Sequence, residues 1–361
     1  MSIYIISNRE VKEDDNTFKN KGKEKVDEAR PVFRIAKCEL DHEKKNVTYE
    51  ILKDEFPFDY SAVTNKLKRE VTNRLKAVNN DTSFKGSSAL FHDLYQQMYA
   101  TNRKEKCSDI LCFIPGYANS FKDNLKHIYT LYDLYISPED SPIEHLIYIS
   151  YPTRNHKFLT YWSDQKDAEA TGRIIGRMYE KTQSFFYQLF QLTDLNRCGH
   201  KIHLAAHSMG NQVIQYMMES IPERKLLPLF EEVLLLHADV PNDLFEPGKA
   251  FSKLDKIANR THVFIHKSDF ALRISEVTKN PKKRLGRFGP SNKSSLSVET
   301  IIVDVSENDS SVSAWEGIID HWGYIKRGEE IQDIKQVLSG VFTERIQGRK
   351  KKRGLDHYYH V

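Results

Sequence analysis

One serine stands in a segment that favours nucleophilic chemistry. Ser208 lies in Ala206-His207-Ser208-Met209-Gly210, between an apolar run and a helix-like stretch. A serine on a sharp strand-to-helix turn takes a strained backbone conformation that presents its hydroxyl, and the residues two before and two after it must be small. Ala206 and Gly210 meet that requirement. The spacing predicts a nucleophilic Ser208, with an ordinary serine N-cap as the alternative; we interpret His207 as a packing or hydrogen-bonding residue.

A nucleophilic serine requires a histidine base and an acid that orients the base. In one common chain order the acid follows the serine and the histidine comes last. Asp269 fits the acid because it ends the apolar run 262–269, although it could also cap a short helix. The alternative acid is Asp239, which ends the preceding run. His321 fits the base because it lies between the apolar run 299–304 and the last helix-like stretch.

The turn after the apolar run 109–114 is expected to supply donors for an oxyanion. It contains Pro115-Gly116-Tyr117, in which Gly116 allows close backbone approach. We expect the backbone N–H groups of Tyr117 and Met209 to form the oxyanion hole. A simple strand-to-helix loop is the alternative for this turn.

No residue pattern indicates a metal or another cofactor. The sequence has no HExxH spacing, and its four cysteines show no CxxC spacing. We therefore expect no cofactor, reduced thiols and a cytoplasmic location. No apolar run approaches the roughly 18 residues of a membrane-spanning helix, so we expect no integral membrane segment, and the first residues are typical of a strand rather than a signal peptide.

The elements that must position these residues follow an alternating pattern. The chain has 361 residues, of which 39% are hydrophobic, and this composition excludes wholesale disorder. From about residue 105, helical periodicity separates short apolar runs at 109–114, 145–150, 201–206, 232–238, 262–266 and 299–304. This alternation predicts an α/β fold with a mostly parallel central sheet and helices on both faces. In such sheets, function collects at the carboxyl ends of the strands.

The first hundred residues show a different pattern. Strands are expected at 2–6, 32–39 and 47–52, and packed amphipathic helices at 63–78 and 90–98. We expect a single domain over 1–344, with 1–104 as an N-terminal extension and 105–344 as the catalytic core. Residues 345–361 are expected to be a basic, flexible tail.

Charge gives little indication of a macromolecular partner. The net charge of +4 is nearly balanced and does not argue for nucleic acid. The excess is local, since RIQGRKKKR at 345–353 holds six basic residues and no acid. Its simplest interpretation is a solubilising end; as a functional element it would contact nucleic acid or an anionic membrane surface.

Short segments of the chain occur in an order found in one family. They are FIPGYANSFKD, SYPTRN, YWSDQKDAEATG, HLAAHSMGN, LLLHADVPNDLF, VFIHKSDFALRIS, RLGRFG and DHWGYI, between about residues 109 and 324. With this ordered set the chain resembles the bacterial α/β-hydrolases grouped as domain of unknown function 900. The resemblance implies an α/β-hydrolase fold and a Ser208–Asp269–His321 triad. The chain departs from the family at Pro115, where a histidine usually precedes the glycine, but this proline removes neither expected oxyanion donor.

These features predict a serine hydrolase that cleaves a small-molecule carboxylic ester through an acyl-enzyme. The alternative is a catalytically silent α/β-hydrolase scaffold that acts as a binding or interaction protein. Arg273, Arg284 and Arg287 lie between the expected acid and base and would favour an anionic substrate, with a solvated loop as the alternative. The sequence leaves the substrate and the oligomeric state open.

Overall fold

The computed structural model describes the larger part of the chain. The described residues are 1–12, 16–19, 33–53, 84–87, 89, 90, 93, 94, 97, 108–117, 119–153, 161–192, 200–278, 282–306 and 320–361. The helix expected at 63–78 lies outside these residues. Within the stripe expected at 90–98, Leu90 and Leu94 are helical and buried.

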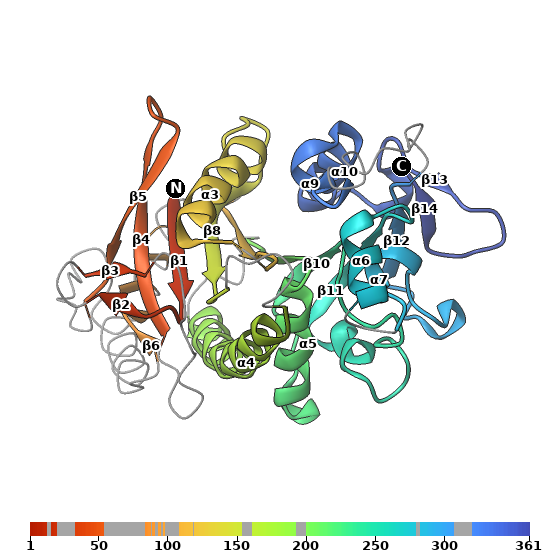
Figure 1. Cartoon of the computed structure of the whole chain (residues 1–361), viewed down its shortest axis with the longest axis horizontal. Helices are drawn as coiled ribbons and strands as arrows, with labels where there is room; N and C mark the ends of the chain where they lie inside the picture. The colour runs from red at the N-terminus through yellow and green to blue at the C-terminus, as the bar shows by residue number, and fades with distance from the viewer. Residues whose placement is uncertain are drawn as a thin grey trace.

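One large sheet crosses the molecule (Figure 1). Its strand order is β13-β14-β12-β11-β10-β9-β7-β8-β1-β4-β5, with β6 paired to β4. The strands are β1 (Ser2–Ser7), β4 (Phe33–Asp41), β5 (Asn46–Ile51), β6 (Phe84–Lys85), β7 (Asp109–Ile114), β8 (Ile143–Ser150), β9 (Ile202–His207), β10 (Phe230–Leu236), β11 (Ala258–Ile265), β12 (Thr300–Asp304), β13 (Lys350–Lys351) and β14 (Tyr358–His360). A separate hairpin joins β2 (Val11–Lys12) to β3 (Thr17–Phe18).

The central strands run parallel, as the alternating pattern predicts. Parallel pairing extends from β1 through β8, β7, β9, β10, β11 and β12 to β14. The pairs β1–β4, β4–β5 and β13–β14 are antiparallel and lie toward the two ends of the sheet. The α/β class with a mostly parallel sheet is therefore confirmed.

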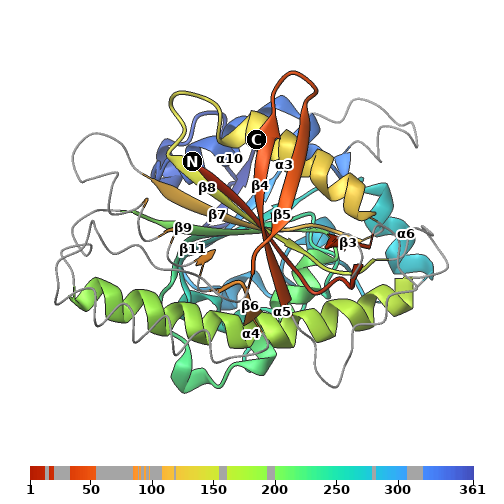
Figure 2. The same cartoon turned by 90° about the vertical axis from the view of Figure 1, so that its left-hand side faces the viewer.

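Helices cover both faces of this sheet. They are α3 (Phe121–Tyr135), α4 (Tyr161–Leu192), α5 (Gly210–Ser220), α6 (Phe270–Thr278), α7 (Leu285–Phe288), α9 (Gly323–Lys326) and α10 (Gly328–Leu338), with 3-10 turns η2 (Glu223–Lys225), η3 (Ala250–Lys256), η4 (Lys293–Ser295) and η5 (Thr343–Arg345). Figure 2 shows α3 and α10 on one face and α4 and α5 on the other. Because both faces are covered, β9 and β12 are buried along their whole length rather than at every second residue.

Two hydrophobic cores hold the layers together. Ile128 of α3 and Val337 of α10 pack in one core, while Ile174 of α4 and Val213 of α5 pack in the other. The strands are thus clamped between two apolar layers. Their carboxyl ends are fixed relative to one another, which is the condition that a preorganised site requires.

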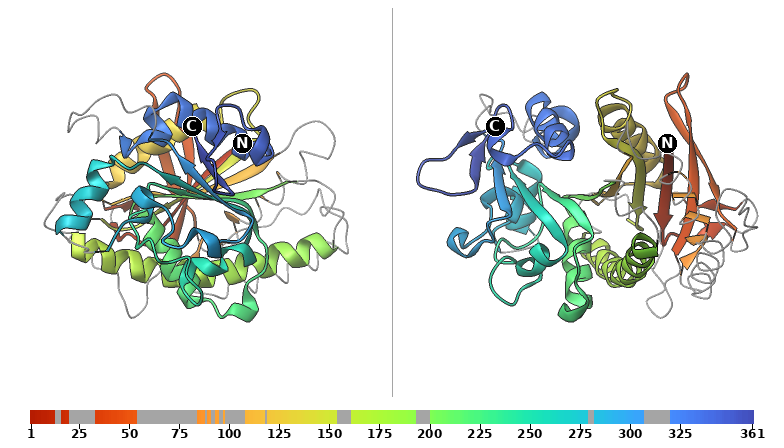
Figure 3. Two further views of the ribbon diagram at one scale, coloured as in Figure 1. Left: turned by 90° about the vertical axis from the view of Figure 1, so that its right-hand side faces the viewer. Right: turned by 180° about the vertical axis from the view of Figure 1, so that it is seen from behind.

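The C-terminal segment corrects one expectation. The sequence predicted a basic, flexible tail over 345–361, but β14 pairs with β12 and extends the sheet. Tyr358 and Tyr359 are buried there, while Lys350 and Lys351 of β13 remain exposed. The basic composition reflects the exposed hairpin, and the aromatic residues that follow provide the docking surface. The hairpin lies at the opposite end of the molecule from β4 and β5 (Figure 3).

Candidate active site

The expected site lies at a switch point of the sheet. β7 lies between β8 and β9. The connection from β7 to β8 runs through α3 on one face, and the connection from β8 to β9 runs through α4 on the other. Where neighbouring crossovers diverge in this way, a crevice opens outside the carboxyl ends of the strands. Pro115-Gly116-Tyr117 follows β7 there, and Ser208 follows β9.

Ser208 sits on a strained turn. Its φ of 52° lies in the left-handed region, which a serine rarely adopts. Its N–H donates to the carbonyl of Leu236 over 3.0 Å, and its carbonyl accepts the N–H of Asp239 over 3.1 Å. Asn211 adds a side-chain amide that donates to the carbonyls of Ala206 and Ser208, each over 3.0 Å. The strained serine is therefore bonded to the neighbouring strand β10 and to its own helix.

The turn requires a glycine at position 210 because another backbone passes close to it. A Cβ at Gly210 would lie 2.6 Å from the carbonyl oxygen of Ile114 and 2.7 Å from that of Pro115. Real Cβ atoms do not approach a backbone oxygen so closely. The small residue expected after the serine is thus explained by contact with the end of β7.

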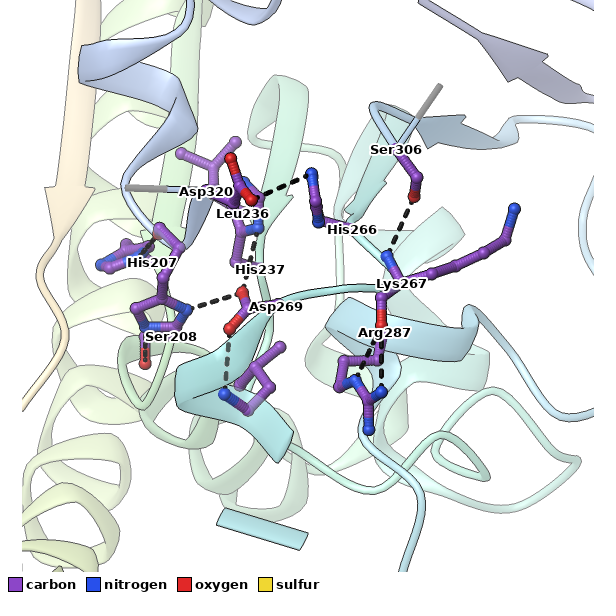
Figure 4. A network of polar contacts seen from close by, with 12 residues as sticks. His207, Ser208, Leu236, His237, His266, Lys267, Asp269, Arg287, Ser306 and Asp320 are labelled. Carbon is purple, nitrogen blue, oxygen red and sulfur yellow. Dashed lines mark hydrogen bonds and ion pairs between the residues drawn. The ribbon is translucent and has the colours of Figure 1, made fainter. Parts of the chain in front are cut away.

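The structure brings three predicted residues into contact. Nε2 of His321 lies 3.0 Å from Oγ of Ser208, and Nδ1 of His321 lies 2.8 Å from Oδ2 of Asp269. Figure 4 shows Ser208 and Asp269 close together in this network of polar contacts. Asp269 Oδ1 accepts the N–H of Leu272 over 2.9 Å, so Asp269 also caps α6. The Asp269 carboxylate therefore fits both interpretations made from the sequence: Oδ1 caps α6, and Oδ2 faces His321.

Asp239 points to different partners. Its Oδ1 accepts a hydrogen bond of 2.9 Å from Ser275 and lies 3.7 Å from Nε of Arg284. Of the two acids considered from sequence, Asp269 is the one that the structure places against His321.

The charge on Asp269 is favoured by its neighbours. Burial alone would raise the pKa of this carboxyl group, but the charge of His321 and hydrogen bonding from His237 and His321 outweigh burial. The pKa of Asp269 therefore lies well below its usual range. An ionised carboxylate is the form that can accept the Nδ1–H of the histidine base.

His207 bonds to the backbone of the predicted base. Its Nε2 lies 2.7 Å from the carbonyl oxygen of His321, so this nitrogen must carry the hydrogen. Burial, with the nearby imidazoles of His321 and His237, lowers the pKa of His207 well below its usual value. A neutral ring that donates to this carbonyl fixes the loop on which His321 stands. The hydrogen-bonding interpretation of His207 agrees with this geometry.

The turn after β7 lies against the strand-to-helix turn that carries Ser208, which we call the elbow. A Cβ at Gly116 would lie 3.1 Å from Cβ of Ser208 and 3.2 Å from Nδ1 of His207. Tyr117 is half-buried and Met209 is fully buried. The two backbones expected to supply oxyanion donors therefore flank the serine from β7 and from α5.

Two residues near the acid were missed by the sequence analysis. Nδ1 of His237 lies 3.3 Å from Oδ2 of Asp269, and Nε2 of His237 lies 3.0 Å from Oε1 of Glu330. Neither was a candidate site residue from the sequence, and Glu330 lies 93 positions from His237 along the chain. No spacing rule connects these positions, because they meet only when α10 packs over the end of β10.

Two of the arginines considered for an anionic substrate have acidic partners within the protein. Arg284 is buried beside Asp239. Arg287 forms an ion pair with Glu276 and donates to the carbonyl of Lys267. Only Arg273 of the three is exposed to solvent. The arginine cluster therefore gives little support to an anionic substrate.

The described residues contain neither a metal-binding cluster nor a membrane-spanning helix. No group of three or more His, Cys, Asp or Glu side chains there is arranged to hold a metal ion. In the same part of the chain, no helix has the length and apolar character needed to cross a membrane.

Comparison with known proteins identifies the family. A family model described as an α/β-hydrolase of unknown function (DUF900) matches residues 92–327, which is more than half of the chain and includes Ser208, Asp269 and His321. Comparisons with curated proteins and with solved structures give no significant match. The order of strands and helices, the strained serine turn and this match agree with one another. The chain therefore belongs to the DUF900 family of α/β-hydrolases.

Proposed function

We propose that this protein is a serine hydrolase that cleaves a carboxylic ester through Ser208, His321 and Asp269. The observation that carries the proposal is the continuous contact from Oγ of Ser208 to Nε2 of His321, over 3.0 Å, and from Nδ1 of His321 to Asp269, over 2.8 Å. Membership of an α/β-hydrolase family supports hydrolytic chemistry but names no substrate. The ester is proposed because a serine acyl-enzyme forms readily from an activated acyl group.

The acylation step follows from these contacts. Oγ of Ser208 attacks the carbonyl carbon of the ester while its proton passes to Nε2 of His321. Asp269 accepts the Nδ1–H and stabilises the resulting imidazolium. When the tetrahedral intermediate collapses, the C–O bond to the alcohol breaks and the alcohol leaves with the proton from Nε2.

Deacylation uses the same groups in reverse. His321 takes a proton from water on Nε2, and the hydroxide equivalent attacks the acyl carbon of the Ser208 ester. The bond from that carbon to Oγ of Ser208 then breaks, Nε2 returns its proton to Oγ, and the carboxylic acid leaves. In both steps the negative oxygen of the intermediate would accept hydrogen bonds from the N–H groups of Tyr117 and Met209. Each such donor contributes about 2.7–4 kcal/mol to stabilising the transition state.

The experiment that tests this proposal is covalent labelling. Wild-type protein should react with a fluorophosphonate probe, because a nucleophilic serine attacks phosphorus as it attacks an acyl carbon. Ser208→Ala should abolish labelling. Ser252→Ala provides a matched control, since its hydroxyl donates to the carbonyl of Lys249 away from the triad, and it should label like wild type.

The outcomes separate the enzyme from a silent scaffold. Labelling that depends on Ser208, followed by turnover of a short p-nitrophenyl ester, would support the hydrolase. Folded wild-type protein that takes up no probe would contradict it and favour a binding protein on the same fold. Turnover across esters of increasing acyl length would then measure the size of the acyl site.

A further inference from the structure

The line of contacts from Ser208 does not end at Asp269. Oδ2 of Asp269 faces Nδ1 of His237 over 3.3 Å (Figure 4). On its other side, Nε2 of His237 faces Oε1 and Oε2 of Glu330 over 3.0 and 3.2 Å. The side chains of Asp269, His237 and Glu330 are 0%, 0% and 1% exposed. A carboxylate, an imidazole and a second carboxylate are therefore stacked behind the predicted base, away from water.

The alternation of negative and positive charge in space explains how three ionisable side chains can be buried together. Burial alone would lower the pKa of His237, but the charge of Glu330 and the contacts of the ring N–H groups with the carboxylates of Asp269 and Glu330 outweigh burial and raise the pKa to about 10. An imidazolium between two carboxylates leaves one net negative charge, and this charge faces His321. Without Glu330 the Asp269–His237 pair would be neutral, and an imidazolium at His321 would lose its counter-charge.

Other titratable groups also face His237, and they bear on any pH dependence. The ring centroids of three further histidines lie nearby: His207, the last residue of β9, at 6.4 Å, His266 after β11 at 6.4 Å, and His321 at 6.0 Å. His266 in turn lies 3.7 Å from Asp320, whose carboxylate is held by Arg327. The only carboxylates in ion-pair contact with His237 among the described residues are Asp269 and Glu330.

The backbone is adapted to hold this arrangement. His237 has a φ of 45° and directly follows β10, the strand next to β9. A second strained residue therefore lies beside the strained Ser208, which follows β9. Such strain clusters at functional sites. A Cβ at Gly323 would lie 2.0 Å from Oε2 of Glu330, so the glycine leaves room for that carboxylate. Glu330 stands in the first turn of α10, where the helix dipole favours a negative charge.

We infer that His237 and Glu330 are positioning residues that act through Asp269, an inference that rests on the proposed hydrolase function. His237, as an imidazolium, fixes Oδ2 of Asp269 in line with Nδ1 of His321. Glu330 restores the negative charge that His237 would otherwise cancel, so that Asp269 still stabilises the imidazolium of the base. Neither residue contacts Ser208, and neither exchanges a proton with the ester.

The test compares Glu330→Gln and His237→Gln by the pH profile of kcat/KM on a p-nitrophenyl ester. Glu330→Gln removes a negative charge behind the base, so the acid limb should move to lower pH. His237→Gln removes a positive charge, so the acid limb should move to higher pH. Both variants should lower kcat by roughly 10–100-fold while KM changes little, because the substrate is not touched.

A second buried pair provides the control. His262 and Glu232 are 0% exposed and face each other over 3.1 Å. They lie within β11 and β10, away from the carboxyl ends of these strands. Glu232→Gln should lower stability but leave the pH profile of the folded protein unchanged. The inference is supported if the acid limbs of Glu330→Gln and His237→Gln move in opposite directions. It is overturned if both limbs move in the same direction, or if both match the profile of Glu232→Gln.

A measurement on wild-type protein covers the case in which the variants fail to fold. Nitrogen NMR of histidine-labelled protein at pH 8 reports the charge of each ring. An imidazolium resistant to deprotonation up to about pH 10 is expected, whereas fourteen neutral histidines would overturn the inference. Protein that takes up the serine probe but shows only neutral rings would contradict this inference alone. Protein that takes up no probe would contradict the hydrolase function as well.

Discussion

At the scale of single residues, orientation and not burial distinguishes the two candidate acids. Asp269 and Asp239 are both buried, and both follow strands at the same edge of the sheet. Only Asp269 contacts His321, whereas Asp239 is bonded to Ser275. The two aspartates therefore form a natural matched pair for mutation.

We expect Asp269→Asn to lower kcat for ester hydrolysis by roughly 10³–10⁴-fold, because an amide cannot hold the histidine in the right tautomer. Asp239→Asn should lower kcat by less than about 10-fold, because it weakens contacts behind the elbow without touching the base. The measurement is kcat per folded molecule, with folding followed by near-ultraviolet circular dichroism. A larger kinetic loss in Asp239→Asn would show that the acid has been misassigned.

The sequence indicated candidate residues whose spacing or chain order is typical of a known chemistry. It gave no indication of residues that come into contact only in the folded structure. Ser208 between small neighbours, and an acid and a histidine in chain order, are local signals. His237 and Glu330 carry no such signal, because their contact depends on how α10 packs over the sheet. A buried carboxylate–imidazolium–carboxylate arrangement is a tertiary property, and one sequence does not encode it in any fixed spacing.

At the scale of elements, the strand-to-helix turn depends on the neighbouring strand. Gly210 opens α5 directly beneath the end of β7. The turn that carries Tyr117 continues from that point. The position of the expected oxyanion donor is therefore tied to the absence of a side chain at Gly210.

We expect Gly210→Ala to push the end of β7 away from the elbow, since the added Cβ would meet two backbone carbonyls. The cost should be about 1–3 kcal/mol of stability, with a kcat loss of roughly 10²-fold through the displaced oxyanion donor. Gly328 is the matched control, because it opens α10 as Gly210 opens α5 and a Cβ there would meet nothing within 4 Å. Thermal melting and ester turnover for both variants check the expectation, and equal behaviour would contradict it.

The core strands were well predicted because buried parallel strands are continuous apolar runs. The expected 109–114 coincides with β7, and the expected 201–206 differs from β9 by one residue at each end. The last strands were not predicted, because both are short: β13 lies within the basic run 345–353, and β14 follows that run. Their place in the sheet depends on β12 and on tertiary contacts that composition does not reveal.

At the scale of the whole molecule, the C-terminal segment connects the edge of the sheet to the candidate site. Arg349 donates to both carboxylate oxygens of Asp333, over 2.6 and 2.7 Å, and these side chains are 1% and 0% exposed. Asp333 lies on α10, one turn after Glu330. The helix α10 is therefore bonded to the C-terminal segment through Asp333 and to His237 through Glu330.

This connection predicts that the hairpin stabilises the whole fold. Arg349→Ala leaves the Asp333 carboxylate buried without its bidentate partner, which typically costs about 3–5 kcal/mol. Arg353→Ala is the matched control, because it removes the same charge from an exposed position of the same segment and should change stability by less than about 0.5 kcal/mol. The midpoint of urea unfolding distinguishes the two variants. A flexible tail would give equal midpoints for Arg349→Ala and Arg353→Ala, whereas a docked hairpin gives a much lower midpoint for Arg349→Ala alone.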